Sequence, residues 1–182
     1  MLNYENKEIL NQQLSNQEIQ KEIIKKNSES LNFLKEILDD LYKYKDQEAY
    51  KNLYKIIDEL HRSNSYYLNY LLTPDGTTRF IFIDKNFKGL SVINITNNGG
   101  TDFAKSIIKK YHYTVQIVSL FSFENNKGKE MVNYFKVLSK KTGIPIILFD
   151  KNSKGKNYYK DQGFKFSGES GDRKEELLVF YP

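Results

Sequence analysis

The sequence has 182 residues, of which 39% are hydrophobic, and no run of about 18 apolar residues, so it can bury one core but does not span a membrane. The lack of cysteine excludes disulfides and thiolate sites, and the two histidines stand far apart; we therefore expect a cytoplasmic protein without a metal. The formal net charge of +5 is uneven, because residues 1–62 carry −2 and residues 63–182 carry +7. A basic second part fits a polyanionic ligand, either a nucleotide cofactor or a nucleic acid, or is a solvated lysine-rich face.

The first 62 residues predict three helices. From Leu2 to Arg62 there is no Gly or Pro, and apolar residues recur at helical spacing over 31–41 and 50–60. Ser28 or Ser30 is a candidate cap for the first of these stripes and Asp46 for the second. Residues 5–26 hold fewer apolar side chains and predict a third helix, which is frayed, used for self-association into a homo-oligomer, or packed as part of a plain helical annex.

After Ser63 the pattern changes to strands. Residues 66–72 are a candidate first strand, and the turn sequence T-P-D-G at 73–76 precedes a predicted hairpin of residues 79–84 and 88–96. The elements expected next are a helix over 102–110 capped by Thr101 or Asp102, a strand over 113–123, a helix over 126–141 and a strand over 144–149. A short helix near 153–162 and strands near 164–167 and 176–181 follow.

The strand, helix and strand over 113–149 predict a right-handed crossover between two parallel strands. Such a pair binds ligands beyond the carboxyl ends of its strands, where the next helix presents its N-terminus. We therefore expect an α/β (α+β) domain over residues 63–182, with a mixed, mostly antiparallel sheet around a central parallel pair, and a separate helical region over residues 1–62.

Two segments carry a resemblance to a known family. Residues 118–132 read V-S-L-F-S-F-E-N-N-K-G-K-E-M-V, and residues 152–164 read N-S-K-G-K-N-Y-Y-K-D-Q-G-F. The first is similar to the fourth strand, pyrophosphate loop and third helix of the GNAT superfamily of N-acetyltransferases, usually R/Q-x-x-G-x-G/A. The second resembles that family's N-x-x-A-x-x-x-Y-x-x-x-G-F segment, in register. The first match is degenerate, because Asn126 stands for the first Gly and Phe123 for Arg/Gln if Gly128 is the second small residue.

The resemblance implies an acetyl-CoA site and no metal. Backbone N–H groups at the helix N-terminus would bind the pyrophosphate, and Gly128 would allow close approach. Asn126 tolerates the left-handed conformation, whereas Glu130 in the first turn would repel a phosphate. The residues expected to bind the cofactor are Leu120, Ser122, Asn125, Asn126, Lys127, Gly128, Lys129, Asn152 and Tyr159. Lys151, Lys154 and Lys156 would add positive charge near the phosphates.

The resemblance also implies catalytic roles. Tyr159 matches the family tyrosine that protonates the departing thiolate, and a phenol with a pKa of about 10 is suited to donate a proton. A main-chain N–H near Leu120 or Ser122 would stabilise the oxyanion. Glu124 is the nearest carboxylate for a general base, with His112 and Asp102 as other candidates. The family's two helices after the first strand are missing, so the acceptor site is rebuilt or absent.

The function expected from these features is N-acetyl transfer from acetyl-CoA to an amine of a protein, a small molecule or aminoacyl-tRNA. The alternative is a catalytically inactive binding module of the same fold for a protein or nucleic-acid partner, which the degenerate loop favours. The composition is compatible with direct binding of a nucleic acid, but the sequence contains no recognised nucleic-acid-binding motif.

Overall fold

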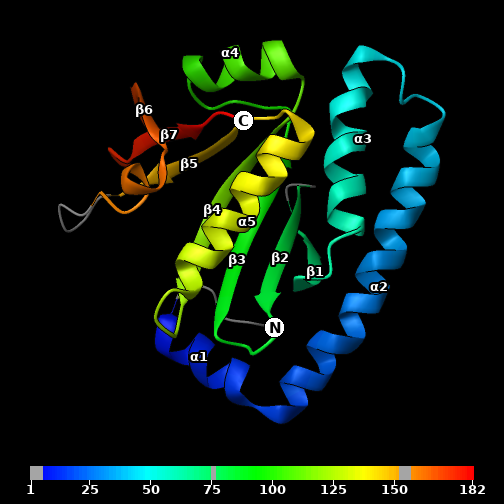
Figure 1. Ribbon diagram of the computed structural model, residues 1–182, viewed down its shortest axis with the longest axis vertical. Coiled ribbons are helices and arrows are strands. Elements are labelled where there is room, and N and C mark those ends of the chain that lie inside the picture. Colours follow the sequence, from blue (N-terminus) through cyan, green and yellow to red (C-terminus); the bar gives the residue numbers. More distant parts are fainter. Residues whose placement is uncertain (1–5, 75–76, 152–156) are drawn as a thin grey trace.

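The computed structural model describes residues 6–74, 77–151 and 157–182. Its strands form one seven-stranded sheet in the order β1-β2-β3-β4-β5-β7-β6 (Figure 1). The elements are α1 (Lys7–Ser15), α2 (Gln17–Tyr42), α3 (Glu48–His61), β1 (Tyr66–Leu72), β2 (Thr78–Asp84), β3 (Gly89–Thr96), α4 (Asp102–Tyr111), β4 (Thr114–Ser122), α5 (Lys127–Thr142), β5 (Ile146–Asp150), the 3-10 helix η1 (Lys160–Gln162), β6 (Lys165–Ser170) and β7 (Glu176–Phe180).

The predicted parallel pair is present. β4 and β5 pair in parallel, with α5 between them in sequence, and the other five pairings in the sheet are antiparallel. The fold is therefore the expected GNAT-like α/β arrangement, and the resemblance to that superfamily holds at the level of the fold.

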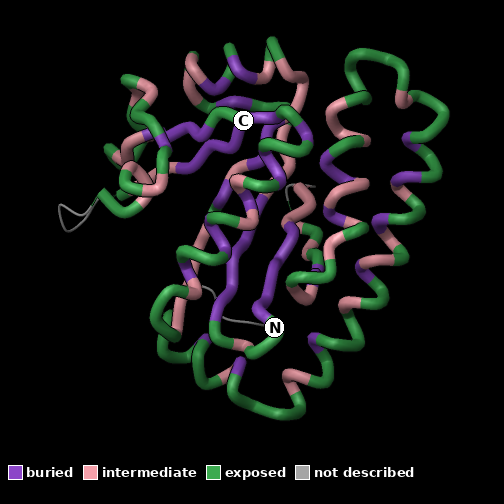
Figure 2. Tube along the Cα trace, in the orientation of Figure 1, coloured by how far each residue is buried: buried purple, intermediate pink, exposed green. Residues whose placement is uncertain are grey.

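Helices cover both faces of the sheet, because side chains alternate along each strand. On β2, Phe80 and Phe82 face α2, α3 and α5, whereas Ile81 and Ile83 face α1. On β5 and β7, Ile147 and Val179 face α4. Figure 2 shows the buried residues along the central strands and on the inner sides of the helices. Within the described part of the chain, no helix is long and apolar enough to cross a membrane.

The helix boundaries in the N-terminal part differ from the predicted ones. α1 ends at Ser15, and α2 runs without a break through Ser28 and Ser30. Asn16 caps α2 instead, because its Oδ1 accepts hydrogen bonds from the N–H groups two and three residues ahead. Ser30 is compatible with a helix interior because its hydroxyl donates to the Lys26 carbonyl oxygen at 2.8 Å.

The structure also decides three other predicted helix boundaries. α3 has Gln47 as its N-cap, not Asp46, and no side chain caps it. α4 is capped by Thr101, as one of the two alternatives predicted. A short helix was expected over residues 153–162. Residues 153–156 lie outside the described residues, and the described remainder of this segment contains only the 3-10 helix η1.

The long helix α2 protects the edge of the sheet. β1 is an edge strand, and the Leu68 N–H donates to Asn27 Oδ1 at 2.7 Å while Asn69 Nδ2 donates to the Ile23 carbonyl oxygen at 3.3 Å. The bond from Leu68 partners a main-chain N–H of the edge strand that would otherwise be available to another chain, and the bond from Asn69 ties the strand to α2. α2 passes along this edge, so that Ile23 packs on one face of the sheet and Leu34 on the other.

Candidate cofactor-binding groove

The groove begins where the parallel strands separate. β4 pairs with β5 only from Val115 to Ile117, although β4 continues to Ser122. At the separation, the pairing of β4 with β3 skips one residue. Ile117 and Ser119 pair with successive residues of β3, so Val118 has no partner in the register and marks a β-bulge. The bulge and the end of pairing open a wedge between the carboxyl ends of the two strands.

The free edge of β4 presents main-chain groups to this wedge. The Phe123 N–H donates to the Lys88 carbonyl oxygen at 2.9 Å, on the β3 side. Main-chain groups alternate along a strand, so those of Leu120 and Ser122 point to the β5 side. The two residues expected to supply an oxyanion donor thus direct their N–H groups into the wedge.

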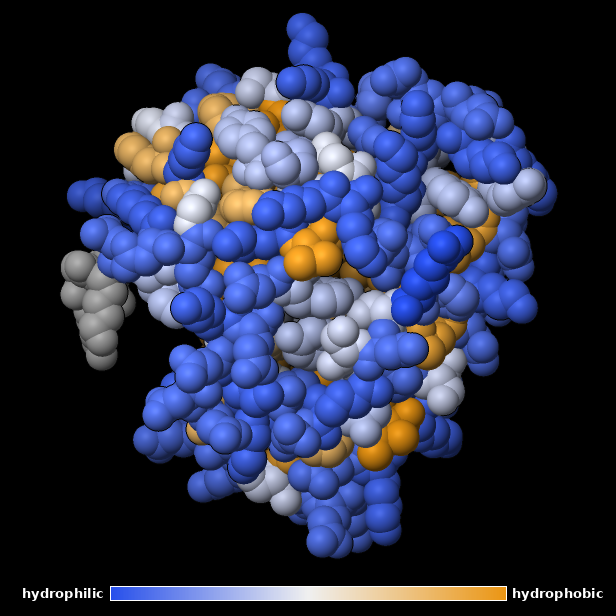
Figure 3. Space-filling view, in the orientation of Figure 1, coloured by the Kyte–Doolittle hydropathy of each residue, from blue (hydrophilic) through white to orange (hydrophobic). Residues whose placement is uncertain are grey.

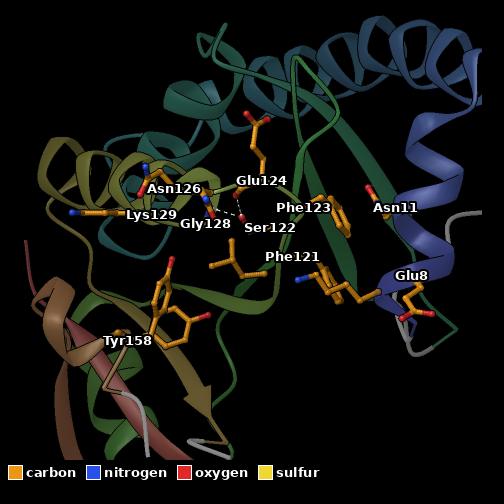
Figure 4. A pocket seen from close by; sticks show the side chains of 14 residues that line it. Glu8, Asn11, Phe121, Ser122, Phe123, Glu124, Asn126, Gly128, Lys129 and Tyr158 are labelled. Atoms are coloured by element: carbon orange, nitrogen blue, oxygen red, sulfur yellow. Dashed lines mark hydrogen bonds between the residues drawn. The ribbon is translucent and has the colours of Figure 1, made fainter. Parts of the chain in front are cut away.

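The wedge is part of a groove with a volume of about 1110 Å³. In Figure 4, the labelled side chains that line the groove belong to β4 and the loop after it, to the start of α5, to α1 and to the segment before η1. It is lined by Lys7, Glu8, Asn11, Leu120, Phe121, Ser122, Phe123, Glu124, Asn125, Asn126, Gly128, Lys129, Tyr158 and Tyr159.

The N-terminus of α5 borders the groove. Asn126, its N-cap, has φ 70° and ψ −14°, the left-handed conformation that asparagine tolerates. The Gly128 N–H donates to Ser122 Oγ at 3.2 Å, and the Ser122 hydroxyl donates to the Glu124 carbonyl oxygen at 2.6 Å. A phosphate bound here would replace Ser122 as the partner of the Gly128 amide.

Two lysines expected to bind phosphate have different surroundings. Lys129 lines the groove, but Lys127 forms ion pairs with Glu130 at 2.8 Å and with Asp84 at 3.4 Å and does not line it. The hydrogen bond to Glu130 raises the pKa of Lys127, so this ammonium stays charged beside its carboxylates. The pairing also offsets the repulsion that Glu130 alone would exert on a phosphate.

Two adjacent tyrosines form another wall of the groove. Tyr159 is largely buried against Phe164, with the two rings 5.8 Å apart, and burial raises the pKa of Tyr159. Tyr158 is more exposed, and a Cβ atom placed on Gly128 would lie 2.8 Å from the Tyr158 hydroxyl oxygen. In Figure 4 the labelled Tyr158 lies beside Gly128. Tyr158, which sequence reasoning missed, therefore lies directly against the start of α5.

Most residues predicted for the site lie in this groove. Leu120, Ser122, Glu124, Asn125, Asn126, Gly128, Lys129 and Tyr159 line it. Asn152 lies outside the described residues. In Figure 4 the Glu124 carboxylate points away from Ser122 and Tyr158, although the residue borders the groove.

The alternative bases lie elsewhere. Asp102 begins α4 and His112 follows it, before β4 starts, whereas the groove is at the other end of β4. The structure adds groove residues that were not among the predicted site residues, and these are Lys7, Glu8, Asn11, Phe121, Phe123 and Tyr158.

The strand order and the separated parallel pair define the GNAT-like class of fold. No protein-family model matches the sequence, and no curated protein matches it. Similar solved structures include a GNAT-family acetyltransferase from Listeria monocytogenes, with a TM-score of 0.41 and 13% identity over 84% of this chain and 89% of that one.

Two other similar structures contain coenzyme A or its acetyl form. PaiA N-acetyltransferase from Thermoplasma acidophilum in complex with coenzyme A has a TM-score of 0.38 and 17% identity, over 81% of this chain and 79% of that one. AtaTR bound with acetyl-CoA has a TM-score of 0.37 and 15% identity, over 58% of this chain and 67% of that one.

Proposed function

We propose that the protein is an N-acetyltransferase that transfers an acetyl group from acetyl-CoA to an amine. The observation that carries this proposal is the free edge of β4 ending at the N-terminus of α5, with Gly128 facing the groove. An extended chain of amides, such as pantetheine, can pair with a free strand edge. A pyrophosphate suits a helix N-terminus that has a nearby lysine, here Lys129.

The side chains supply the remaining chemistry. In the reaction a C–N bond forms and a C–S bond breaks, the amine loses a proton and the sulfur gains one. The N–H groups of Leu120 and Ser122 are proposed to stabilise negative charge on the carbonyl oxygen. Tyr159 is proposed to donate the proton to sulfur, because it lines the groove and a phenol is protonated at neutral pH.

Binding of acetyl-CoA is the first test. Acetyl-CoA at 100 times its Kd is expected to increase the free energy of unfolding by roughly 2.7 kcal/mol, measured by thermal or chemical denaturation. ATP serves as a control, because it supplies phosphates without pantetheine. Release of free thiol over a panel of amines then measures turnover. No stabilisation at millimolar acetyl-CoA would contradict the proposal.

A binding module is the second candidate, and one observation favours it. The Tyr158 hydroxyl and Ser122 Oγ already lie against Gly128, where a phosphate would approach. If acetyl-CoA does not bind, the net charge of +7 over residues 63–182 directs the search to nucleic acid. Binding to an RNA or DNA oligonucleotide that weakens steeply with salt would then support this candidate.

Replacing Gly128 with valine is expected to weaken acetyl-CoA binding at least about tenfold. A side chain there collides with Tyr158 and blocks approach to the α5 backbone. Calorimetric titration measures the Kd. Gly100→Val is the matched control, because a Cβ at Gly100 meets no atom within 4 Å. Equal affinities for Gly128→Val and the wild type would show that the cofactor does not approach this helix terminus.

A further inference from the structure

The two faces of the sheet are covered to different extents. α2, α3 and α5 pack against one face, and the surface over them is mostly hydrophilic (Figure 1, Figure 3). On the second face, α1 packs against β2 and β3, and α4 packs against β5 and β7. α1 and α4 lie at opposite ends of the molecule in Figure 1. The middle of the second face therefore lies between two helices.

A small cavity opens in this gap. It has a volume of about 40 Å³ and is lined by Leu71, Arg79, Ile81, Val92, Val118 and Ser119. A water molecule needs roughly 10–15 Å³ of such volume, so the cavity holds about three non-hydrogen atoms. Val118, at the bulge of β4, is 38% exposed and forms the rim. The cavity is thus open to solvent and has the size of a carboxylate group.

Arg79 brings an unpartnered donor to this cavity. Within the described chain, Arg79 Nε is buried without a hydrogen-bond partner, and Arg79 takes part in none of the ion pairs. Asn94 pairs with Arg79 across β2 and β3, so the two side chains lie on the same face. Asn94 Oδ1 is likewise buried without a partner in the described chain. Buried polar groups are nearly always hydrogen-bonded, so two adjacent exceptions indicate a place where a polar ligand binds.

The chemistry of these side chains selects an oxygen anion. A guanidinium only donates hydrogen bonds and stays charged, so Arg79 Nε requires an acceptor, for which a carboxylate is the strongest partner. Rotation of the Asn94 amide by a half-turn exchanges Oδ1 with Nδ2 and offers a second N–H to the same group. The other side chains of the cavity are apolar except Ser119, and they suit the methylene groups next to the carboxylate.

The place of the cavity along β4 sets the length of the ligand. Val118 and Ser119 line the cavity, and the next two residues, Leu120 and Phe121, line the cofactor groove. Ser119 precedes the proposed oxyanion donors, Leu120 and Ser122, by one and three residues, or roughly 3–10 Å at about 3.3 Å per residue. Ser119 and Phe121 point to the same face of the sheet. A chain of several methylene groups can therefore join a carboxylate in the cavity to an amine in the groove.

We infer that the cavity binds the carboxylate of the acceptor, and that the acceptor is an aliphatic amine with a carboxylate several carbon atoms from the reacting nitrogen. This inference rests on the proposed acetyl transfer and names its substrate class. Arg79 binds the carboxylate, and the amine reaches the acetyl group at the free edge of β4. There the C–N bond forms and the C–S bond breaks. The amine loses its proton to water, and the released thiolate takes a proton from Tyr159.

Two amines that differ in one group test the substrate class. ε-Aminocaproate carries a carboxylate where hexylamine carries a methyl group, and both offer the same primary amine. With acetyl-CoA and the full chain, kcat/KM measured by thiol release is expected to be at least about tenfold higher for ε-aminocaproate. Equal values, or a preference for hexylamine, would overturn the carboxylate site.

Replacing Arg79 tests the residue. Arg79→Met removes the guanidinium and keeps an unbranched side chain, and it is expected to bring the ratio of kcat/KM for the two amines to about one. The ratio is the readout because a general defect in folding lowers both values alike. Arg62→Met is the control, because Arg62 is exposed and lines neither the cavity nor the groove. A preference for ε-aminocaproate that persists in Arg79→Met would overturn the inference.

Asn94→Asp tests the same site without removing Arg79. The substitution changes the shape of the side chain little and places a carboxylate across the strands from Arg79. An opposite-charge pair of this kind is stabilising, so the midpoint of thermal unfolding is expected to rise while the preference for ε-aminocaproate is lost. Asn98→Asp is the control, because it adds the same charge at an exposed position. An unchanged preference in Asn94→Asp would contradict the assignment of the cavity.

A direct titration separates failure of this inference from failure of the proposed function. If the wild type binds no acetyl-CoA, acetyl transfer is rejected, and ε-aminocaproate is then titrated into the protein by calorimetry. Binding that Arg79→Met removes, and that hexylamine does not reproduce, supports a carboxylate site on the second face of the sheet. Absence of binding to the wild type overturns that site as well.

Discussion

Tyr159→Phe is expected to lower kcat for acetyl transfer about 10- to 1000-fold and to change the Kd for acetyl-CoA little. The hydroxyl acts on charge that develops at sulfur in the transition state, whereas the ring packs against Phe164 in every state. Stopped-flow thiol release measures kcat, and calorimetry measures the Kd. Equal kcat values for wild type and variant, with acetyl-CoA bound, would remove Tyr159 from the mechanism.

Tyr158→Phe is the matched comparison, because the neighbouring hydroxyl lies on Gly128. Its removal is expected to change the Kd for acetyl-CoA more than kcat. The reverse result, a large loss of kcat in Tyr158→Phe alone, would transfer the proton donor to Tyr158. The two variants thus decide which hydroxyl acts on sulfur and which acts at the loop.

The buried phenol also has a consequence for stability. Burial raises the pKa of Tyr159 in the folded state above its unfolded value of about 10. The folded protein therefore holds this proton more tightly, and the contribution to stability is present below pH 10 and is lost as the pH rises further. Tyr159→Phe is expected to reduce the loss of stability above pH 10 in denaturant titrations.

Deleting residues 1–26 is expected to abolish cooperative unfolding. The deletion removes three buried side chains, Leu10, Leu14 and Ile23, from the cluster that covers one face of β2 and β3. Leu→Ala in a core costs about 2–5 kcal/mol for each residue. The truncated chain also loses the Ile23 carbonyl oxygen that accepts the Asn69 side-chain bond. Urea denaturation followed by circular dichroism measures the transition.

Single substitutions make this test quantitative. Leu14→Ala is expected to lower the free energy of unfolding by about 2–5 kcal/mol, and Ile9→Ala by about 0.5 kcal/mol or less. Ile9 is the control, because it lies on the same helix and is 41% exposed. A truncated protein that still unfolds in one sharp transition would show that the core does not require α1, in agreement with the frayed helix that the sequence analysis held as one alternative.

Residues close in sequence account for most of what was predicted correctly. The hairpin of β2 and β3, helix α5 and the parallel pairing of β4 with β5 follow from local hydrophobic periods and the rule of right-handed crossovers. Gly128, Asn126 and Ser122 could be placed near one another because they belong to one strand, loop and helix. Local sequence patterns extend over only a few residues, and the contacts among these three residues extend no further, so the patterns could predict them.

The boundaries of α1 and α2 show where local patterns are insufficient. Serine and asparagine both cap helices, and the sequence analysis named Ser28 and Ser30 as candidates but not Asn16. Packing decided between them, because an unbroken α2 covers the edge of β1 and places Ile23 and Leu34 on opposite faces of the sheet. The gain from burying both faces exceeds the small cost of two serines within a helix.

By itself, the sequence determined where the strands lie along the chain, the helix that connects the parallel pair, and the loop at Asn126–Gly128. Only the tertiary structure brought α1 to the groove, although α1 and β4 are about 100 residues apart along the chain. It also decided that Lys127 pairs with Asp84 and that Tyr158 contacts Gly128. The physical reason is that side-chain direction and long-range contact depend on how all the layers pack together, and no period or motif within one segment encodes them.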